Sequence, residues 1–358
     1  MQAVRLHAVQ DLRLTDVDRP APGPGEVQVR VEAAGICGTD RHLFMGEFPC
    51  TPPVTLGHEF SGLVTAVGAG VALTLGTRVT CDPNTPCLAC DPCLRGRVNL
   101  CARNSVTGIT RDGGFAPYAV FPAHKAIDLS KNLHPHHGAF CEPLACTVHG
   151  LDMAAPLPGE RVIILGGGVI GLLALQLARN AGAEVLLITR HPDKRDLATA
   201  LGAVATAATP DEALTLWPKG ADVVLECAGV GDTVEAAPAL TRSGGRIVIL
   251  GVLPKGQKVQ IEPFDLLFRE IQLLHSFINP FTQSRAAAMI ANGTVQVAPL
   301  ISRTISLAVP PQSASTRCVA MARPSSRKAG STPRSKRVRA SLASISFWPV
   351  FAMLSGSK

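Results

Sequence analysis

Four cysteines form the densest group of reactive side chains in the sequence. Cys87, Cys90, Cys93 and Cys101 follow the spacing C-x2-C-x2-C-x7-C. Four thiolates this close can complete a tetrahedral shell around Zn²⁺, and a loop held in this way needs little apolar core. An iron–sulfur cluster uses similar ligands, but the bacterial ferredoxin run has three residues before its last cysteine and a proline after it. The spacing therefore predicts a structural zinc site.

A second group combines a thiol, an imidazole and carboxylates. Residues 35–42 read GICGTDRH and residues 57–62 read GHEFSG. Cys37 and His58 are side chains that zinc accepts, and Glu59 could orient these ligands or join them. One cysteine and one histidine 21 residues apart are weak evidence on their own. Glu142 could supply a third ligand, although no spacing rule requires it.

A glycine-rich turn follows the apolar segment 161–165 and opens a second apolar segment. The pattern G-x-G-x-x-G is weak by itself. Between a strand and a helix, however, it brings backbone N–H groups and a helix N-terminus against a pyrophosphate. We therefore expect a dinucleotide to bind at the turn formed by Gly166, Gly168, Val169, Ile170 and Gly171.

The end of the next apolar segment should select between NAD and NADP. An acidic residue there would bind the ribose 2′-hydroxyl, whereas an arginine would accept a 2′-phosphate. The sequence has Thr189 and Arg190 at this point, with Arg195 further on and no carboxylate at the strand end. We predict NADP as the favoured cofactor, with NAD as the alternative. These cations could instead belong to a solvated surface loop.

The segments that must position these groups show two different sequence patterns. Residues 1–145 are rich in Gly, Pro, Val and Thr, with short segments that alternate or run apolar, which favours a mostly β domain with many turns. Four short apolar strands follow at 161–165, 184–188, 222–226 and 246–250. Strands alternating with helical segments predict a parallel α/β sheet with right-handed crossovers.

Composition argues against a nucleic-acid partner, although the net charge is +7. Residues 308–358 contain nine Lys and Arg and no acidic residue, which leaves 25 basic and 27 acidic residues in the first 307. The body of the protein is therefore nearly neutral.

Targeting signals are also absent from the pattern. The N-terminus has no apolar stretch typical of a signal peptide, and the longest apolar run, 162–178, is too short to span a membrane. We expect a cytoplasmic protein with no membrane partner, in which clustered cysteines bind metal and do not form disulfides.

In this order, these motifs resemble the zinc-containing medium-chain dehydrogenase/reductase family. The stretch from Gly57 to Gly62, continuing to Gly68, is similar to the family signature G-H-E-x2-G, and the resemblance covers about residues 1–307. Glu142, in the context E-P-L-A, resembles the sorbitol and threonine dehydrogenase branches.

The resemblance implies an α/β fold with two parts: a GroES-like β domain and a doubly wound, parallel Rossmann sheet. The catalytic domain would comprise residues 1–145 and return at 283–307, with a dinucleotide-binding domain at 146–282 between them. The family suggests a homodimer or homotetramer and a small alcohol or polyol as substrate.

The resemblance also assigns roles to individual residues. Cys37, His58 and Glu142 would surround a catalytic zinc, Glu59 would be an occasional ligand, and Asp40 would orient His58. Thr39 and His42 match the family's proton relay. Threonine and aldoses are alternative substrates.

The chain end departs from the family pattern. After about Leu307, acidic residues and hydrophobic periodicity disappear, as a shift of reading frame would produce. We expect 308–358 to be a basic, frameshifted or disordered tail that does not supply the closing strand of the catalytic domain. A zinc- and nucleotide-binding protein without turnover is therefore the non-enzymatic alternative.

Overall fold

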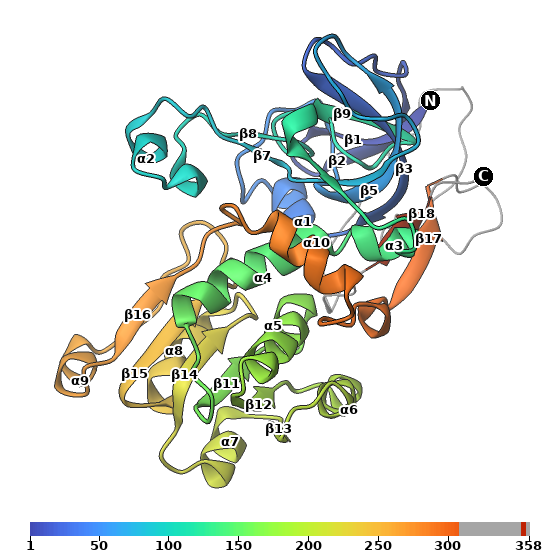
Figure 1. Ribbon diagram of the computed structural model, residues 1–358. Coiled ribbons are helices and arrows are strands. Elements are labelled where there is room, and N and C mark those ends of the chain that lie inside the picture. Colours follow the sequence, from blue (N-terminus) through green and yellow to red (C-terminus); the bar gives the residue numbers. More distant parts are fainter. Residues whose placement is uncertain (308–351, 356–358) are drawn as a thin grey trace, which may run out of the picture.

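Two β sheets of different kinds organise the chain. The computed structural model describes residues 1–307 and the backbone of 352–355. Figure 1 shows the antiparallel strands of the N-terminal half at the top and a parallel sheet at the bottom, with helices α4 and α10 between them. The prediction of an α/β protein with a β-rich part and a doubly wound sheet is confirmed.

Strand β3 (Glu26–Gly35) is the centre of the antiparallel half. It pairs along its length with β5 (Glu59–Val67), and its first part pairs with β9 (Tyr118–Pro122). Phe60 of β5 meets Phe121 of β9 edge to face, with ring centroids 5.6 Å apart. Both rings are buried, so this core fixes β5, whose first residue is Glu59. The other strands of this half are β1 (Gln2–Ala8), β2 (Asp11–Asp16), β4 (Val54–Thr55), β6 (Arg78–Cys81), β10 (Ala126–Asp128) and β17 (Arg303–Ser306).

The chain end requires one correction. Strand β18 (Ala352–Ser355) lies between β3 and β17, antiparallel to β3 and parallel to β17. The expectation that residues 308–358 supply no strand to this sheet is therefore wrong for these four residues. Main-chain pairing needs no side-chain periodicity, and the edge of β3 at residues 33–35 offers N–H and C=O groups to any extended segment. What we predicted for 308–351 and 356–358 lies outside the described residues.

The parallel sheet has the strand order β13-β12-β11-β14-β15-β16, and every neighbouring pair is parallel. This is the 3-2-1-4-5-6 order of a Rossmann fold, in which ligands bind beyond the carboxyl ends of the strands where the order reverses. That point lies between β11 and β14. The strands are β11 (Arg161–Leu165), β12 (Glu184–Ile188), β13 (Ala205–Ala207), β14 (Ala221–Glu226), β15 (Thr241–Ile249) and β16 (Gln272–His275).

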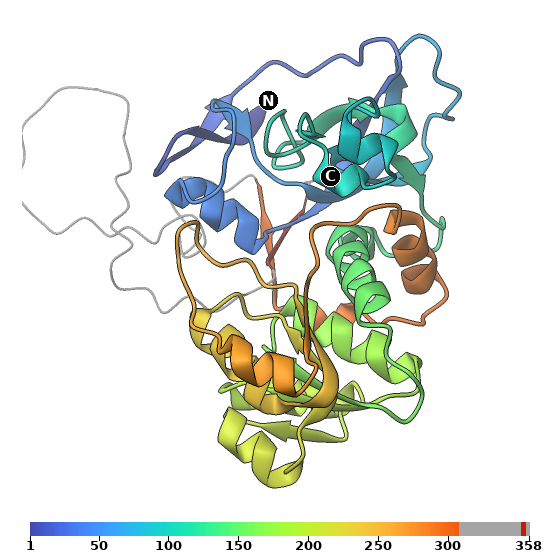
Figure 2. The same ribbon diagram turned by 90° about the vertical axis from the view of Figure 1, so that its left-hand side faces the viewer.

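Helices cover the sheet and connect the two halves, as the view in Figure 2 also shows. Helix α4 (Cys141–Ala154) packs against both α5 (Val169–Asn180) and α10 (Gln283–Ala291). Gly150 lets α4 also approach the end of β15, because a Cβ there would lie 2.3 Å from Cδ2 of Leu250, the residue after that strand. The remaining helices of the parallel half are α6 (Pro192–Ala200), α7 (Pro210–Leu216), α8 (Gly231–Leu240) and α9 (Pro263–Phe268).

Three short helices lie in the N-terminal half: α1 (Gly38–Met45), α2 (Asp91–Leu94) and α3 (Pro135–Gly138). A lobe containing α2 and the hairpin of β7 (Asn84–Thr85) and β8 (Ser105–Val106) projects from the antiparallel half in Figure 1. Single 3-10 turns occur at η1 (Val98–Leu100), η2 (Ala123–Lys125) and η3 (Ala298–Leu300). The domain boundaries that we expected within the chain stay predictions. Among residues 1–307 and 352–355, no helix is both long and apolar enough to cross a bilayer.

Candidate metal and nucleotide sites

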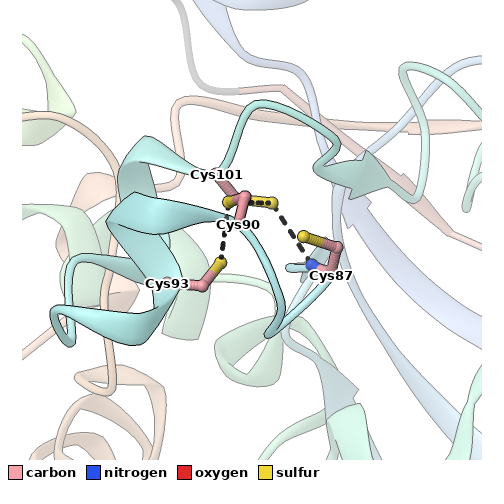
Figure 3. A group of neighbouring side chains, drawn as sticks. All are labelled: Cys87, Cys90, Cys93 and Cys101. Atoms are coloured by element: carbon pink, nitrogen blue, oxygen red, sulfur yellow. Dashed lines mark hydrogen bonds between the residues drawn. The ribbon is translucent and has the colours of Figure 1, made fainter.

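The four clustered cysteines converge in the projecting lobe, with their sulfur atoms all within 4.8 Å of one another. Figure 3 shows the four side chains pointing toward a common centre. Cys90 Sγ lies 3.5 Å from Cys93 Sγ and 3.8 Å from Cys101 Sγ. Four thiolates at zinc–sulfur distances of about 2.3 Å in a tetrahedron lie about 3.8 Å apart, so the group fits zinc.

Electrostatics in the lobe also call for a cation. The backbone N–H of Ala89 favours the Cys87 thiolate and lowers the pKa of Cys87 to about 6. Desolvation and the neighbouring Cys90 raise the pKa of Cys93 to about 12. Cys93 therefore ionises near neutral pH only if a positive charge offsets the cost. Zinc would supply that charge.

A second group brings together Cys37, His58 and Glu59, whose ligand atoms all lie within 4.8 Å of one another. Cys37 immediately precedes α1, and its backbone N–H donates to Asp40 Oδ2 at 2.9 Å. His58 and Glu59 lie where β5 begins. Two elements distant in sequence thus meet here because β3, which leads to α1, pairs with β5 through Gly35 and Glu59.

This second group contains buried polar atoms without partners. His58 Nδ1 and Glu59 Oε2 have no hydrogen-bond partner among the described residues. Burial and the carboxylates Asp40 and Glu142 raise the pKa of the Cys37 thiol to about 11. Burial also raises the pKa of Glu59 well above its usual value. Unpaired buried groups of this kind are costly, and a bound cation would offset that cost.

Glu142 lies beside this group on the first turn of α4 but is not one of the three mutually close ligands. It is close enough to raise the pKa of His58, together with Asp40 and Glu59, although burial opposes the charged imidazole. Its Oε1 lies 3.4 Å from Cys146 Sγ, one helical turn later. Glu142 as a zinc ligand stays a prediction. Cys146 is a neighbour that we did not assign, and its spacing of four residues on a helix was the available signal.

The two predicted relay residues lie on α1, three positions apart and therefore on one face of the helix. Thr39 Oγ1 is 3.6 Å from Cys37 Sγ. His42 Nδ1 is 2.6 Å from Glu47 Oε2, so the imidazole has a carboxylate partner that the sequence did not suggest. The roles of Thr39 and His42 in catalysis stay predictions.

The glycine-rich turn lies directly at the carboxyl end of β11. Gly166 has a φ of 112°, and a Cβ on Gly171 would lie 1.9 Å from Gly166 O, so neither position accepts a side chain. Gly168 is the N-cap of α5, and no side chain caps this helix. The first N–H groups of α5, including those of Val169, Ile170 and Gly171, therefore have no side-chain partner, which fits an anionic pyrophosphate.

The residues after β12 lie next to this turn. A Cβ on Gly167 would lie 2.9 Å from Thr189 Cγ2. Arg195 Nη1 donates to Thr189 O at 2.8 Å. Arg190 is exposed and, among the described residues, has no acidic partner. The arrangement presents a cation beside the turn.

Two family models match this chain. Residues 23–131 match the family model of the alcohol dehydrogenase GroES-like domain, and residues 169–292 match that of the zinc-binding dehydrogenases. D-arabinitol dehydrogenase 1 of Uromyces fabae is 33% identical over 307 residues, covering 83% of this chain and 88% of that protein. L-threonine 3-dehydrogenase of Pyrococcus furiosus is 33% identical over 306 residues, covering 80% and 86%.

The chain belongs to the zinc-containing medium-chain dehydrogenase/reductase family. A zinc-binding dehydrogenase from Sinorhizobium meliloti 1021, solved with NADP bound, has 47% sequence identity and a TM-score of 0.86, covering 99% of this chain and 98% of that one.

Membership confirms several sequence-based predictions. The protein is an enzyme of the zinc-dependent alcohol and polyol dehydrogenase kind, with a GroES-like domain and a Rossmann sheet. Zinc and a nicotinamide nucleotide are the cofactors of medium-chain dehydrogenases of this type. The individual site residues stay predictions, and they are argued below.

Proposed function

We propose that this enzyme oxidises a polyol or secondary alcohol reversibly, with NADP favoured over NAD as the hydride acceptor. The observation that carries the proposal is the trio Cys37, His58 and Glu59, whose ligand atoms all lie within 4.8 Å of one another and of which His58 and Glu59 are buried. The reaction also requires a bound nicotinamide nucleotide, and the glycine-rich turn would bind it. D-arabinitol dehydrogenase, among the relatives, acts on a polyol by its name.

Zinc binding at this point would involve Cys37, His58 and Glu142, with Glu59 as an exchanging ligand. A zinc ion would supply a Lewis acid: it can lower the pKa of bound water from 15.7 to roughly 7, and a bound alcohol should respond similarly. Asp40 would orient His58, and the 3.7 Å between Asp40 Oδ1 and His58 Nδ1 supports that role. The cysteine lobe, Cys87 to Cys101, would hold the structural zinc.

The substrate hydroxyl proton would leave through α1. Thr39 would accept it first, because its hydroxyl lies beside the Cys37 sulfur. His42, on the same helix face, would pass it toward solvent, and the 2.6 Å contact with Glu47 Oε2 would hold the imidazole in place. The nicotinamide nucleotide supplies the hydride acceptor.

NADP selectivity would come from Arg190, with Thr189 and Arg195 shaping the site. Arg190 is exposed, and the carbonyl of Thr189 holds Arg195. An exposed guanidinium can bind a 2′-phosphate with two parallel hydrogen bonds. The NADP bound to the Sinorhizobium relative supports this choice.

Turnover separates this proposal from its alternatives. Initial rates should be measured with a panel of polyols, diols, aldoses and threonine, each with NAD and with NADP. A polyol or diol giving the highest kcat/KM with NADP is the expected result. Activity confined to threonine or to an aldose would replace the substrate class. Zinc and nucleotide binding without turnover of any panel member would favour the non-enzymatic alternative.

We further propose a homodimer or homotetramer in the cytoplasm. Helix α9 exposes Phe264, Leu267 and Phe268 beside β16, which ends the parallel sheet, and a second copy could cover them. The cysteines of the described part form no disulfide, which suits a reducing compartment. Light scattering after size-exclusion chromatography should give a multiple of the 37.4 kDa chain mass. A monomer would contradict the oligomer proposal.

A further inference from the structure

Glu226 is a fully buried carboxylic acid that the mechanism above does not use. It is the last residue of β14, and its partner on the adjacent strand is Leu165, immediately before the glycine-rich turn. Its side chain has no exposed surface. The residue therefore lies where the strand order reverses, at the carboxyl edge that binds nucleotides in this fold.

One oxygen of this carboxyl group holds the loop after β14. Glu226 Oε1 accepts from Ala228 N at 2.8 Å, from Gly229 N at 2.9 Å and from Thr233 Oγ1 at 2.8 Å. The backbone carbonyl of Glu226 accepts from Leu250 N at 2.8 Å and Gly251 N at 3.0 Å. A single residue thus fixes both loops, 227–230 and 250–252.

These two loops pack against each other and against the glycine-rich turn. A Cβ on Gly251 would lie 2.2 Å from Gly229 N and 2.4 Å from Glu226 Oε2. A Cβ on Gly166 would lie 3.0 Å from Ala228 N. The Glu226 side chain therefore holds loop 227–230 by hydrogen bonds and packs closely against Gly251, while loop 227–230 in turn packs against Gly166 of the glycine-rich turn.

The second oxygen, Oε2, is buried and has no hydrogen-bond partner among the described residues. Burial raises the pKa of Glu226, although the contact with Thr233 opposes this change. An unpaired polar atom in the core costs stability, so the three hydrogen bonds at Oε1 must outweigh the cost of leaving Oε2 unpaired.

We propose that Glu226 is a positioning residue for the nicotinamide nucleotide, which it serves by holding loops 227–230 and 250–252 at the width that the nucleotide requires. This inference rests on the proposed function, since it takes a nicotinamide nucleotide as the ligand of the glycine-rich turn. Glu226 acts through the loop backbones and does not itself contact the reacting atoms.

The test is the affinity for NADPH and NADH, measured by fluorescence titration without substrate, together with zinc content and melting temperature. For Glu226→Ala, loss of up to three hydrogen bonds at one oxygen should weaken both nucleotides by about tenfold or more, with zinc content unchanged. Glu226→Gln keeps an acceptor at the Oε1 position and should restore both affinities to within about threefold of the wild type. Glu184→Ala is the matched control, because Glu184 is an exposed residue at the amino end of β12, away from the carboxyl ends of the strands where Glu226 lies.

Wild-type affinity in Glu226→Ala, or a Gln variant as weak as the Ala variant, would overturn the positioning role. If Glu226→Ala does not fold, Thr233→Val removes one donor to the same oxygen and should weaken both nucleotides by about threefold. An unchanged affinity in Thr233→Val would then overturn the role. A wild-type protein that binds neither nucleotide would overturn the proposed function itself, and that result is distinct from normal binding in both wild type and variant.

Discussion

His58 Nδ1 lies 3.7 Å from Asp40 Oδ1, and both side chains are buried. Neither of these two atoms has a hydrogen-bond partner among the described residues. Asp40 is itself held by the backbone N–H of Cys37 through its other oxygen. One carboxylate thus holds the backbone of Cys37 and faces the imidazole of His58, and it is placed to set the orientation of both residues.

Asp40→Asn should therefore loosen zinc at the second site. Partners of metal-binding histidines are worth about 10- to 100-fold in metal affinity or activity. We expect a faster loss of one zinc per chain to a chelator, measured by elemental analysis against time. Asp211→Asn, at an exposed position of α7, is the control. Equal zinc retention in the two variants would contradict an orienting role for Asp40.

Cys37→Ser should reduce zinc from two ions per chain to one and abolish turnover. Nucleotide binding should persist, because the glycine-rich turn belongs to the parallel sheet and not to the antiparallel half. Elemental analysis and NADPH titration test the two halves of this prediction. Cys50→Ser is the control, since Cys50 belongs to neither cysteine group. Substantial activity in Cys37→Ser would refute the catalytic role of this site.

Arg190→Ala should weaken NADP far more than NAD. A charge-assisted contact to the 2′-phosphate is worth roughly 1.5–3 kcal/mol, or about one to two decades of affinity. Dissociation constants of NADP and NAD, measured for the wild type and for Arg190→Ala, test this prediction. Lys219→Ala is the control. It removes an exposed cation just before β14, at the amino ends of the strands, and should change neither dissociation constant. Equal losses for the two nucleotides would make Arg190 an ordinary surface residue.

Glu160 should make stability depend on pH at the acid end. Arg246 Nη2 donates to Glu160 Oε2 at 2.6 Å and to Ala155 O at 2.8 Å, and this pairing lowers the pKa of Glu160 below its usual 4.5. The contribution is thus fully present above the unfolded pKa and is lost as the pH falls through the lower folded pKa. Glu160→Gln should lose about 1 kcal/mol at pH 7 and show a shallower acid decline in melting temperature. Parallel curves for the two proteins would exclude this linkage.

Local patterns made part of the molecule predictable. The cysteine lobe is readable because its four ligands lie within 15 residues of sequence. Strands β11, β12, β14 and the later part of β15 are continuous apolar runs, as buried parallel strands require. Strands β13 and β16 were missed, since Ala-Thr-Ala and Gln-Leu-Leu-His carry too little pattern and form only because a neighbouring strand offers its edge.

Contacts between distant segments could not be predicted from the sequence. Nothing in the order of residues indicates that Glu47 meets His42 or that Glu226 joins two loops, because both depend on turns whose geometry has no readable code. The contact between Glu142 and Cys146 could be predicted from their spacing of four residues on a helix, but the direction in which that helix faces could not. Strand β18 likewise forms through pairing with β3 and β17, and no hydrophobic periodicity in its sequence predicts it.

The position of β18 has a consequence for synthesis on the ribosome. Gly35 pairs with Met353, so the two sides of this ladder are translated 318 residues apart. At about 5–20 residues per second, that interval is on the order of 15 to 60 s. During this time the edge of β3 at residues 33–35 must wait for its partner, while the whole parallel sheet can form first. A nascent chain therefore carries an open template for other extended segments until residues 353–355 have been made, and this is the period in which a chaperone that covers strand edges would protect it most.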